Sequence, residues 1–357
     1  MFLFRCKLSD FCIFTTNKRY PLQEYMNSKD NLIDIIIPCK NAEPYLKKCL
    51  QSIQDQTIKS WKCWIVDDHS TDKSQQMALS FEREDTRFKS LKNMGEGIID
   101  ALQTACKQIN GQWITRMDAD DVMAPDKLEK LSSLLLAHGE GNIACGKVHY
   151  FSKEGIGDGY QKYAQWINDT ISSKEPYQEM YRECIIPSPS WMMWQSDFNK
   201  LGAFQNLQYP EDYDFAFKVY KAQFPIQATN DIVHYWRDYP NRTSRTDPNY
   251  ADNRFLNLKV QHFLDIDYQS NQTLVLWGAG KKGKLIAKLL QASDINFMWI
   301  TNNPKKVGLH IYDHLIQSDT TLPNNGQVII AVAAPKELEW IDSRLKAKRN
   351  LRTFYFS

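Results

Sequence analysis

The chain has 357 residues, enough for two domains at roughly 150 residues per domain. Hydrophobic residues make up 43% and charged residues 24% of it, and 44 Lys and Arg against 42 Asp and Glu leave a net charge of +2. This composition excludes a wholly disordered chain, and the nearly balanced charge gives no overall attraction to nucleic acid. No apolar run approaches the roughly 20 residues that a membrane-spanning helix needs.

The eight cysteines are spaced singly, with no Cys-x-x-Cys pair and no histidine at zinc spacing beside them. This usage is typical of free thiols in a reducing cytosol, so we expect a cytoplasmic protein, either free or peripheral at the inner face of the cytoplasmic membrane. Residues 1–30 show neither a continuous apolar core nor a small-residue cleavage site. We expect them to be a loosely attached extension, and Met26 leaves open a later start.

From Leu32 onward, short β-branched runs alternate with amphipathic helical patterns, which is typical of a mostly parallel sheet covered by helices. The periodicity predicts strands at 32–37, 61–66, 113–117 and 232–236, and helices at 43–54, 70–81, 98–109, 127–137 and 213–222. The stretch after the helix at 127–137, up to about residue 210, is less regular and rich in Tyr and Trp. We expect this stretch to be irregular and to line a site or fill a second layer.

A second α/β pattern follows a polar boundary segment. It contains a helical pattern at 255–264, a strand at 273–277, a glycine-containing loop, a helix and a strand at 297–301. We therefore expect a helical linker over 246–271 and a smaller Rossmann-like domain over 272–357. No internal repeat or low-complexity segment is present in the sequence.

Carboxylates follow two of the predicted strands. Asp67 and Asp68 end one strand, and Asp118, Asp120 and Asp121 follow another. The carboxyl ends of parallel strands form the edge where open α/β sheets bind ligands. Crowded carboxylates repel one another unless a cation offsets them, so the pattern favours Mg²⁺ or Mn²⁺. For either cluster taken alone, helix caps and turn residues remain the alternative.

Four ordered segments together resemble the family 2 glycosyltransferases with a GT-A fold. They are Ile35-Ile36-Ile37-Pro38-x-x-Asn41, Val66-Asp67-Asp68-His69-Ser70-Thr71-Asp72, Arg116-Met117-Asp118-Ala119-Asp120-Asp121 and Pro210-Glu211-Asp212-Tyr213-Asp214. Such a series is far more specific than a single D-x-D. The resemblance implies a GT-A domain over about 31–245, with a mixed, mostly parallel sheet and helices on both faces.

The resemblance also implies a binding site for a nucleotide sugar, expected to be a uridine diphosphate sugar. Asp68 matches the carboxylate that holds the nucleobase in the family. Pro38 and Asn41 match residues that line the same pocket, and Asp118 matches the residue near the ribose.

The metal and the catalytic base follow from the same resemblance. Asp120 matches the last acid of the D-x-D that binds Mn²⁺ or Mg²⁺, with Asp121 as a supporting ligand. Asp212 matches the general base, which deprotonates the acceptor hydroxyl in a single inverting displacement. Glu211 and Trp191 lie where relatives shape the acceptor pocket. A buried core aromatic is the alternative for Trp191, and a helix first turn is the alternative for the Glu211-Asp212 pair.

The segment His234-Tyr235-Trp236-Arg237 followed by Arg242-Thr243-Ser244-Arg245 resembles the segment that closes over the diphosphate in this family. The resemblance implies diphosphate contacts by His234, Arg237, Arg242 and Arg245, for which solvated surface arginines are the alternative. The sequence departs from the family at Asp238-Tyr239, where many relatives carry a histidine.

In the C-terminal domain, Gly278, Gly280 and Gly283 match the dinucleotide-binding fingerprint between a strand and a helix. The acid that would bind the ribose hydroxyls is missing, because Asn302 and Asn303 follow the next strand. We therefore expect a nucleotide-type loop without NAD, and a structural or assembly role remains open.

These observations predict an inverting, metal-dependent glycosyltransferase that acts on a hydroxyl of a glycan or lipid-linked saccharide in surface polysaccharide synthesis. The alternative is a regulatory or scaffold protein that binds a nucleotide sugar without turnover and senses a ligand through its C-terminal domain. The intact Asp68, Asp120 and Asp212 favour the enzyme. An oxidoreductase is disfavoured by the missing acid at Asn302.

Overall fold

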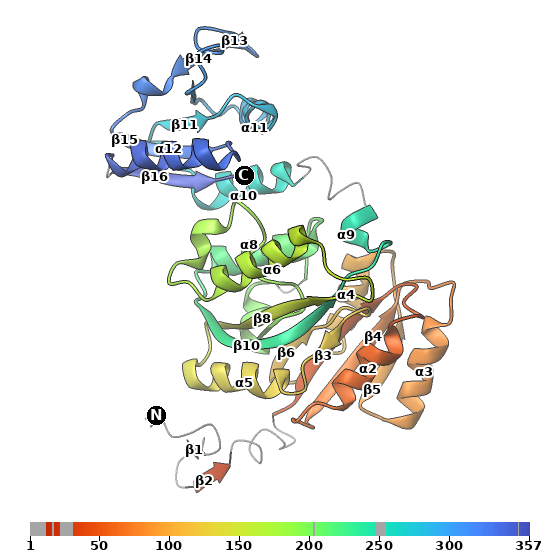
Figure 1. The fold of residues 1–357 in the computed structure, drawn as a ribbon. Helices are drawn as coiled ribbons and strands as arrows, with labels where there is room; N and C mark the ends of the chain where they lie inside the picture. Colours follow the sequence, from red (N-terminus) through yellow and green to blue (C-terminus); the bar gives the residue numbers. More distant parts are fainter. Residues whose placement is uncertain (1–11, 16–17, 22–30, 203, 247–254, 349) are drawn as a thin grey trace. The chain divides into compact units, whose positions relative to one another are not determined.

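The computed structural model describes residues 12–15, 18–21, 31–202, 204–246, 255–348 and 350–357 (Figure 1). The chain divides into two compact units, one formed by residues 1–174 with 186–239 and the other by residues 175–185 with 240–357. The predicted N-terminal extension lies mostly outside the described residues, apart from the antiparallel pair β1 (Cys12–Thr15) and β2 (Lys18–Pro21). Within the described residues, no helix is long and apolar enough to cross a membrane.

The first unit is built on an eight-stranded sheet with the order β5-β4-β3-β6-β9-β8-β10-β7. Its strands are β3 (Ile33–Cys39), β4 (Trp61–Asp67), β5 (Phe88–Lys92), β6 (Trp113–Arg116), β7 (Val122–Met123), β8 (Ile143–Phe151), β9 (Trp191–Trp194) and β10 (Ile226–Arg237). Strand β3 pairs in parallel with β4 and β6, β4 pairs in parallel with β5, and β8 pairs in parallel with β10. Strand β9 is antiparallel to β6 and β8, and β7 is antiparallel to β10. The predicted mixed, mostly parallel α/β fold is confirmed.

The helices of this unit follow the apolar spacing of the sequence. They are α2 (Leu46–Gln54), α3 (Ser74–Glu84), α4 (Ile98–Cys106), α5 (Lys127–His138), α6 (Asp158–Ile171), α7 (Gln195–Lys200) and α8 (Glu211–Lys221). In α2 the buried residues are Leu46, Cys49, Leu50 and Ile53, the stripe that the periodicity predicts. The consecutive Ile35, Ile36 and Ile37 of β3 are also buried, as expected for a strand that is covered on both faces.

The stretch that we expected to be irregular contains regular elements, so that expectation was wrong. Strand β8, helix α6, strand β9 and helix α7 all lie between residues 143 and 200. In α6, Tyr160, Tyr163 and Ile167 follow helical spacing and pack in one cluster with Tyr150 of β8 and Trp236 of β10. Because half-buried aromatic residues form the apolar face of this helix, its periodicity is hard to see in the sequence.

The second unit contains a six-stranded sheet with the order β13-β14-β12-β11-β15-β16. Its strands are β11 (Leu274–Trp277), β12 (Met298–Thr301), β13 (His310–Ile311), β14 (His314–Ser318), β15 (Asn325–Ile330) and β16 (Asn350–Tyr355). Its helices are α9 (Thr243–Thr246), α10 (Leu256–Ile266), α11 (Lys281–Ala292) and α12 (Pro335–Lys346). Short 3₁₀ turns lie at Pro176–Glu179 and Asp319–Thr321. Numbered along the chain, the five parallel strands have the order 3-2-1-4-5, which is a doubly wound Rossmann-type order.

The segment 175–185 belongs to the second unit, although it interrupts the first in sequence. Its anchor is Tyr181, whose hydroxyl donates to Asp267 Oδ2 at 2.7 Å and whose ring stacks on Phe356 with centroids 5.1 Å apart. Lys259 Nζ also donates to the carbonyl oxygen of Arg182 at 2.6 Å. No sequence pattern indicates this exchange, because the partners lie more than 70 residues apart along the chain.

Candidate active site

The predicted nucleobase carboxylate, Asp68, follows the end of β4 and is buried. Its Oδ2 accepts from Lys40 Nζ at 3.0 Å, and its Oδ1 accepts from Asn93 Nδ2 at 2.6 Å and from the Gly97 amide at 3.0 Å. Burial alone would raise the pKa of Asp68, but these donors outweigh burial and hold the pKa below its usual value. The carboxylate is therefore ionised and fixed. Lys40 and Asn93 were not predicted from the sequence, although Lys40 lies beside the motif residue Asn41.

The two loops that the motifs place around Asp68 lie together. Asn41 has a φ of 49°, a left-handed conformation that Asn tolerates better than most residues. Its Oδ1 accepts from the Thr71 amide at 2.8 Å, and its own amide donates to Ser70 Oγ at 3.0 Å. Pro38 of β3 pairs with Val66 of β4, so the ends of both strands reach the same edge of the sheet.

A buried arginine connects the two acidic motifs. Arg116, the last residue of β6, donates through Nε to Asp118 Oδ1 at 3.1 Å and through Nη1 to Glu211 Oε1 at 2.8 Å. Burial disfavours the charged guanidinium, but Asp118, Glu211 and Asp212 outweigh burial and raise the pKa of Arg116 above its usual value. Arg116 therefore remains a cation between the end of β6 and the start of α8.

The predicted base, Asp212, is half-buried in the first turn of α8. Burial and the neighbouring carboxylate of Glu211 raise the pKa of Asp212 to about 7, while Arg116 opposes that shift. A carboxylate with a pKa near 7 suits a general base, because a large fraction of it is ionised near neutral pH and it still accepts a proton readily.

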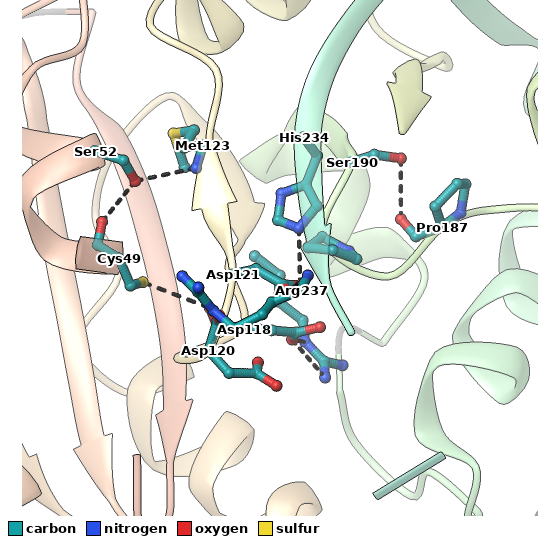
Figure 2. A network of polar contacts seen from close by, with 12 residues as sticks. Cys49, Ser52, Asp118, Asp120, Asp121, Met123, Pro187, Ser190, His234 and Arg237 are labelled. Carbon is teal, nitrogen blue, oxygen red and sulfur yellow. Dashed lines mark hydrogen bonds and ion pairs between the residues drawn. The ribbon is translucent and has the colours of Figure 1, made fainter. Parts of the chain in front are cut away.

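Asp121 is buried and is held by strand β10. His234 Nε2 lies 2.9 Å from Asp121 Oδ2, and the Arg237 amide donates to Asp121 Oδ1 at 2.7 Å (Figure 2). These contacts use both carboxylate oxygens, so Asp121 and His234 connect the D-x-D turn to β10. Their expected contacts with metal and diphosphate stay predictions.

Asp120 lies in the same turn but has a different environment. Its carboxylate points away from the His234 ring (Figure 2) and accepts from the Tyr239 hydroxyl at 2.9 Å. The Tyr239 ring packs at a tilt against Tyr45 with centroids 4.7 Å apart, and the Arg237 guanidinium lies 5.0 Å from the Tyr45 ring. Arg237 Nε also donates to the carbonyl oxygen of Asp120 at 2.6 Å. Tyr239, at the position where the sequence departs from the family, thus contacts the Asp120 carboxylate, whose metal role stays a prediction.

The residues present would hold a divalent metal only if a bound substrate supplied further ligands. The described residues contain no group of three His, Cys, Asp or Glu side chains that would hold a metal alone. Mg²⁺ is commonly held by one or two carboxylates together with substrate phosphates, so this finding agrees with a metal shared with a diphosphate. Both carboxylate oxygens of Asp121 already have partners from β10, so Asp120 stays the predicted metal ligand.

Trp191 does not line an acceptor pocket, which corrects the expectation that it stacks on a sugar. Only 2% of this residue is exposed. Its ring packs against Phe198, Phe204 and Phe215, and its carbonyl oxygen accepts from Thr115 Oγ1. The open alternative, a core aromatic, describes Trp191 correctly.

The sequence analysis also missed a buried lysine beneath the site. Lys127, the first residue of α5, is fully buried, and its Nζ donates to the carbonyl oxygens of Arg116, at 3.4 Å, and Pro189. Burial lowers its pKa to about 7. Lys127 thereby connects the end of β6 to the loop that precedes β9. Its only sequence signal is its place nine residues after Asp118.

Two predicted residues lie in the other unit. Arg242 and Arg245 flank or lie within the short α9, and the Arg245 amide donates to the Arg242 carbonyl oxygen at 2.8 Å. Their contact with a diphosphate stays a prediction.

The glycines of the C-terminal loop serve close packing. Gly278 has a φ of 119°, and a Cβ on Gly283 would meet the Gly278 carbonyl oxygen at 1.9 Å. Gly283 is therefore needed for α11 to approach the end of β11. Gly280 precedes α11 as its N-cap residue. The role of this loop in nucleotide binding stays a prediction.

Comparison with known proteins agrees with this geometry. Residues 34–202 match the family model described as glycosyl transferase family 2. Among curated proteins, glycosyltransferase GlyA of Streptococcus pneumoniae serotype 4 is 33% identical over 157 residues, covering 42% of this chain and 22% of GlyA. The Escherichia coli protein WfgD, named UDP-Glc:alpha-D-GlcNAc-diphosphoundecaprenol beta-1,3-glucosyltransferase, is 35% identical over 108 residues, covering 30% of this chain and 42% of WfgD. The chain thus spans well under two thirds of either relative.

Among solved structures, TarS of S. aureus (residues 1–349, in complex with UDP-GlcNAc) superposes with a TM-score of 0.53 at 17% identity, covering 72% of this chain and 71% of TarS. At this identity the likeness shows the fold. Together with the placement of the motifs, it shows that the first unit has a GT-A-type fold, and residues 34–202 of this chain match glycosyl transferase family 2.

Proposed function

We propose that this protein is an inverting, metal-dependent glycosyltransferase that moves a sugar from a nucleotide donor, expected to be a uridine diphosphate sugar, to a hydroxyl of a glycan or lipid-linked saccharide. The observation that carries the proposal is the Arg116 bridge. One buried guanidinium contacts both Asp118, on the donor side, and Glu211, beside the base Asp212. The two halves of a transferase site are thereby connected within one unit.

In the proposed reaction, the acceptor hydroxyl oxygen forms a bond to the anomeric carbon while the bond from that carbon to the diphosphate oxygen breaks. Asp212 takes the hydroxyl proton, and the electron pair of the breaking bond leaves with the nucleoside diphosphate. With a pKa of about 7, Asp212 is partly ionised at neutral pH and fully ionised for this task at higher pH. No covalent enzyme intermediate is needed, and inversion follows from a single displacement.

The other site residues hold the donor. Asp68, fixed by Lys40 and Asn93, is an acceptor for the N–H groups of a base. Asp118, which accepts from Arg116 Nε, would contact the ribose. Asp120 would hold a divalent metal, which offsets the charge that develops on the departing diphosphate.

The names of the relatives support the substrate classes. WfgD is named for a UDP-Glc donor and an acceptor that carries a diphosphoundecaprenol lipid. A chondroitin synthase of Escherichia coli is also similar, at 32% identity over 98 residues. These names favour a UDP-sugar donor and a role in polysaccharide synthesis for this chain.

Calorimetric titration tests the donor half of the proposal without a known acceptor. We expect UDP to bind the protein with Mn²⁺ and to bind weakly after EDTA treatment. Asp68→Asn should weaken UDP binding in both conditions, whereas Asp55→Asn, a change of an exposed aspartate outside the site, should not. Absence of UDP binding with Mn²⁺, together with binding of another nucleoside diphosphate, would replace the proposed donor.

A further inference from the structure

Positive charge is concentrated in one part of the second unit. Between Lys281 and Leu315 the sequence contains six lysines against two aspartates, a net charge of +4 in a chain whose total is +2. The two acids are Asp294, near the end of α11, and Asp313, in the turn between β13 and β14. The lysines lie in two segments, Lys281–Lys288 and Lys305-Lys306, and a hydrogen bond from Lys306 Nζ to the Ala279 carbonyl oxygen brings the second segment to the start of the first.

Helix α11 carries one stripe of this charge. Lys288 lies four residues after Lys284 and three residues after Leu285. Both side chains are therefore its neighbours on one side of the helix. Leu285 is 37% exposed, and Lys288 is exposed as well. The buried side of α11 is formed instead by Ile286, Ala287 and Leu290.

The β13–β14 hairpin and the turn before it carry exposed apolar side chains. Leu309 is 50% exposed, Leu315 is 46% exposed and Tyr312 is 38% exposed. Figure 1 shows this hairpin extending beyond the rest of its sheet. Exposed apolar side chains on a projecting hairpin are poor partners for water, so they indicate a surface that contacts another apolar phase.

The helix stripe and the hairpin are neighbours. Lys288 Nζ lies 4.7 Å from the Tyr312 ring centroid, and Gln291 Nε2 donates to the Tyr312 carbonyl oxygen at 2.7 Å. At the other end, Lys306 Nζ donates to the Ala279 carbonyl oxygen at 2.8 Å, which brings the Lys305-Lys306 turn to the loop before α11. The lysines and apolar residues therefore belong to one region of the second unit.

We propose that this region docks the second unit onto an anionic lipid bilayer surface. We define the docking face by Lys284, Leu285, Lys288, Lys305, Leu309 and Tyr312. Lysines attract a negatively charged bilayer surface, and their long stems allow neighbouring leucines to enter the boundary between headgroups and acyl chains. Tyrosine is enriched at that boundary because its ring is apolar and its hydroxyl is polar.

The topology supplies a matched control on the opposite side of the sheet. In the 3-2-1-4-5 order, right-handed connections place α11 and α12 on opposite faces. Helix α12 carries the exposed Lys336 and Lys346. Removing these two lysines changes the net charge as much as removing Lys284 and Lys288, but leaves the docking face intact.

The test is co-sedimentation of the full chain with vesicles of phosphatidylcholine alone or mixed with phosphatidylglycerol. We expect binding to the anionic vesicles that weakens as salt is raised. Lys284→Gln/Lys288→Gln should lower the partition coefficient about 30-fold, and Lys336→Gln/Lys346→Gln should change it little. Leu309→Gln should lower it about 10-fold, whereas Leu79→Gln, at a 43%-exposed leucine of the first unit, should not.

Equal binding to both vesicle types, or equal loss in the two double-lysine variants, would overturn the proposal. Absence of vesicle binding together with self-association that Leu309→Gln abolishes would assign the face to a second copy of the chain instead. None of these three results bears on UDP binding, so the docking proposal and the transferase proposal can fail separately.

Discussion

Arg116 Nη1 donates to Glu211 Oε1 at 2.8 Å, although the two residues are 95 positions apart in the chain. Both side chains are 6% exposed, so the pair is shielded from water. The same guanidinium contacts Asp118 at 3.1 Å. A single cation therefore fixes the distance between the D-x-D turn and the helix that carries Asp212, and it offsets the repulsion among their carboxylates.

Replacing Arg116 should be costly for stability. Arg116→Met leaves the carboxylate of Glu211 buried without its cation, and breaking a buried ion pair from one side typically costs about 3–5 kcal/mol. We expect urea denaturation to show a loss of this size. Glu211→Gln keeps a hydrogen-bond acceptor for Arg116 and should cost less. A loss below about 1 kcal/mol for Arg116→Met would mean that the bridge does not organise the site.

Asp212→Asn should separate chemistry from donor binding. The amide is nearly the same size as the carboxylate but does not accept the hydroxyl proton, so turnover should fall by about 10²–10⁴. Calorimetry should show UDP affinity close to that of the parent protein. If turnover persists at the parent rate, another group is the base.

The pH dependence of turnover follows from the same residue. Because the pKa of Asp212 is about 7, the carboxylate is ionised above that pH and protonated below it. We expect the rate to be level above about pH 8 and to fall about tenfold per pH unit below about pH 6. A rate that stays level down to pH 5 would contradict the assignment of Asp212 as the base.

Lys127 should make the free energy of unfolding rise with pH between about pH 7 and pH 9. Its pKa is about 7 in the folded protein against an ordinary value of 10.5 in the unfolded chain. Between these values the unfolded chain binds one more proton, so stability rises with pH by up to about 1.4 kcal/mol per unit. Urea denaturation from pH 7 to pH 9 should show this rise in the parent protein relative to Lys127→Met. Parallel curves for the two proteins would show that Lys127 is charged in the fold.

Tyr239 should tune the metal site through Asp120. Its hydroxyl donates to Asp120 Oδ2 at 2.9 Å, and groups that orient a metal ligand in this way typically contribute 10–100-fold to metal affinity, an order-of-magnitude range. Tyr239→Phe keeps the ring contact with Tyr45 but removes this hydrogen bond. We expect Mn²⁺-dependent UDP binding to weaken by roughly that factor, with no change in EDTA. Tighter Mn²⁺ binding in the variant would show that Tyr239 competes with the metal.

The sequence predicted the fold where its periodicity was clear. The stripe of Leu46, Cys49, Leu50 and Ile53 and the continuous apolar run of β3 gave the α/β pattern directly. Helix α6 was missed because aromatic side chains occupy its apolar face, and β10 extends six residues before the predicted start at residue 232.

The positions of candidate-site residues were predicted where a motif contains them. Residues that contact distant segments of the chain were missed. Asp68, Asp118 and Asp212 lie at the strand and helix ends that the sequence indicates. Lys127 was missed because its Nζ donates only to backbone groups, the carbonyl oxygens of Arg116 and Pro189, among the contacts that the structure describes. A backbone acceptor leaves no trace in the sequence. The assignment of Trp191 failed for a similar reason, because its burial depends on Phe198, Phe204 and Phe215 packing around it.

The central claim is that Asp120 and Asp212 divide metal-dependent donor activation and base catalysis between them. The most direct test is release of nucleoside diphosphate from a panel of nucleotide sugars, with Mn²⁺ or EDTA, for the parent protein, Asp120→Asn, Asp212→Asn and the control Asp55→Asn. We expect Mn²⁺-dependent release from one donor by the parent and the control, with loss in both site variants. Mn²⁺-dependent UDP binding should be lost only in Asp120→Asn. Release that is unchanged in Asp120→Asn and indifferent to EDTA would contradict it.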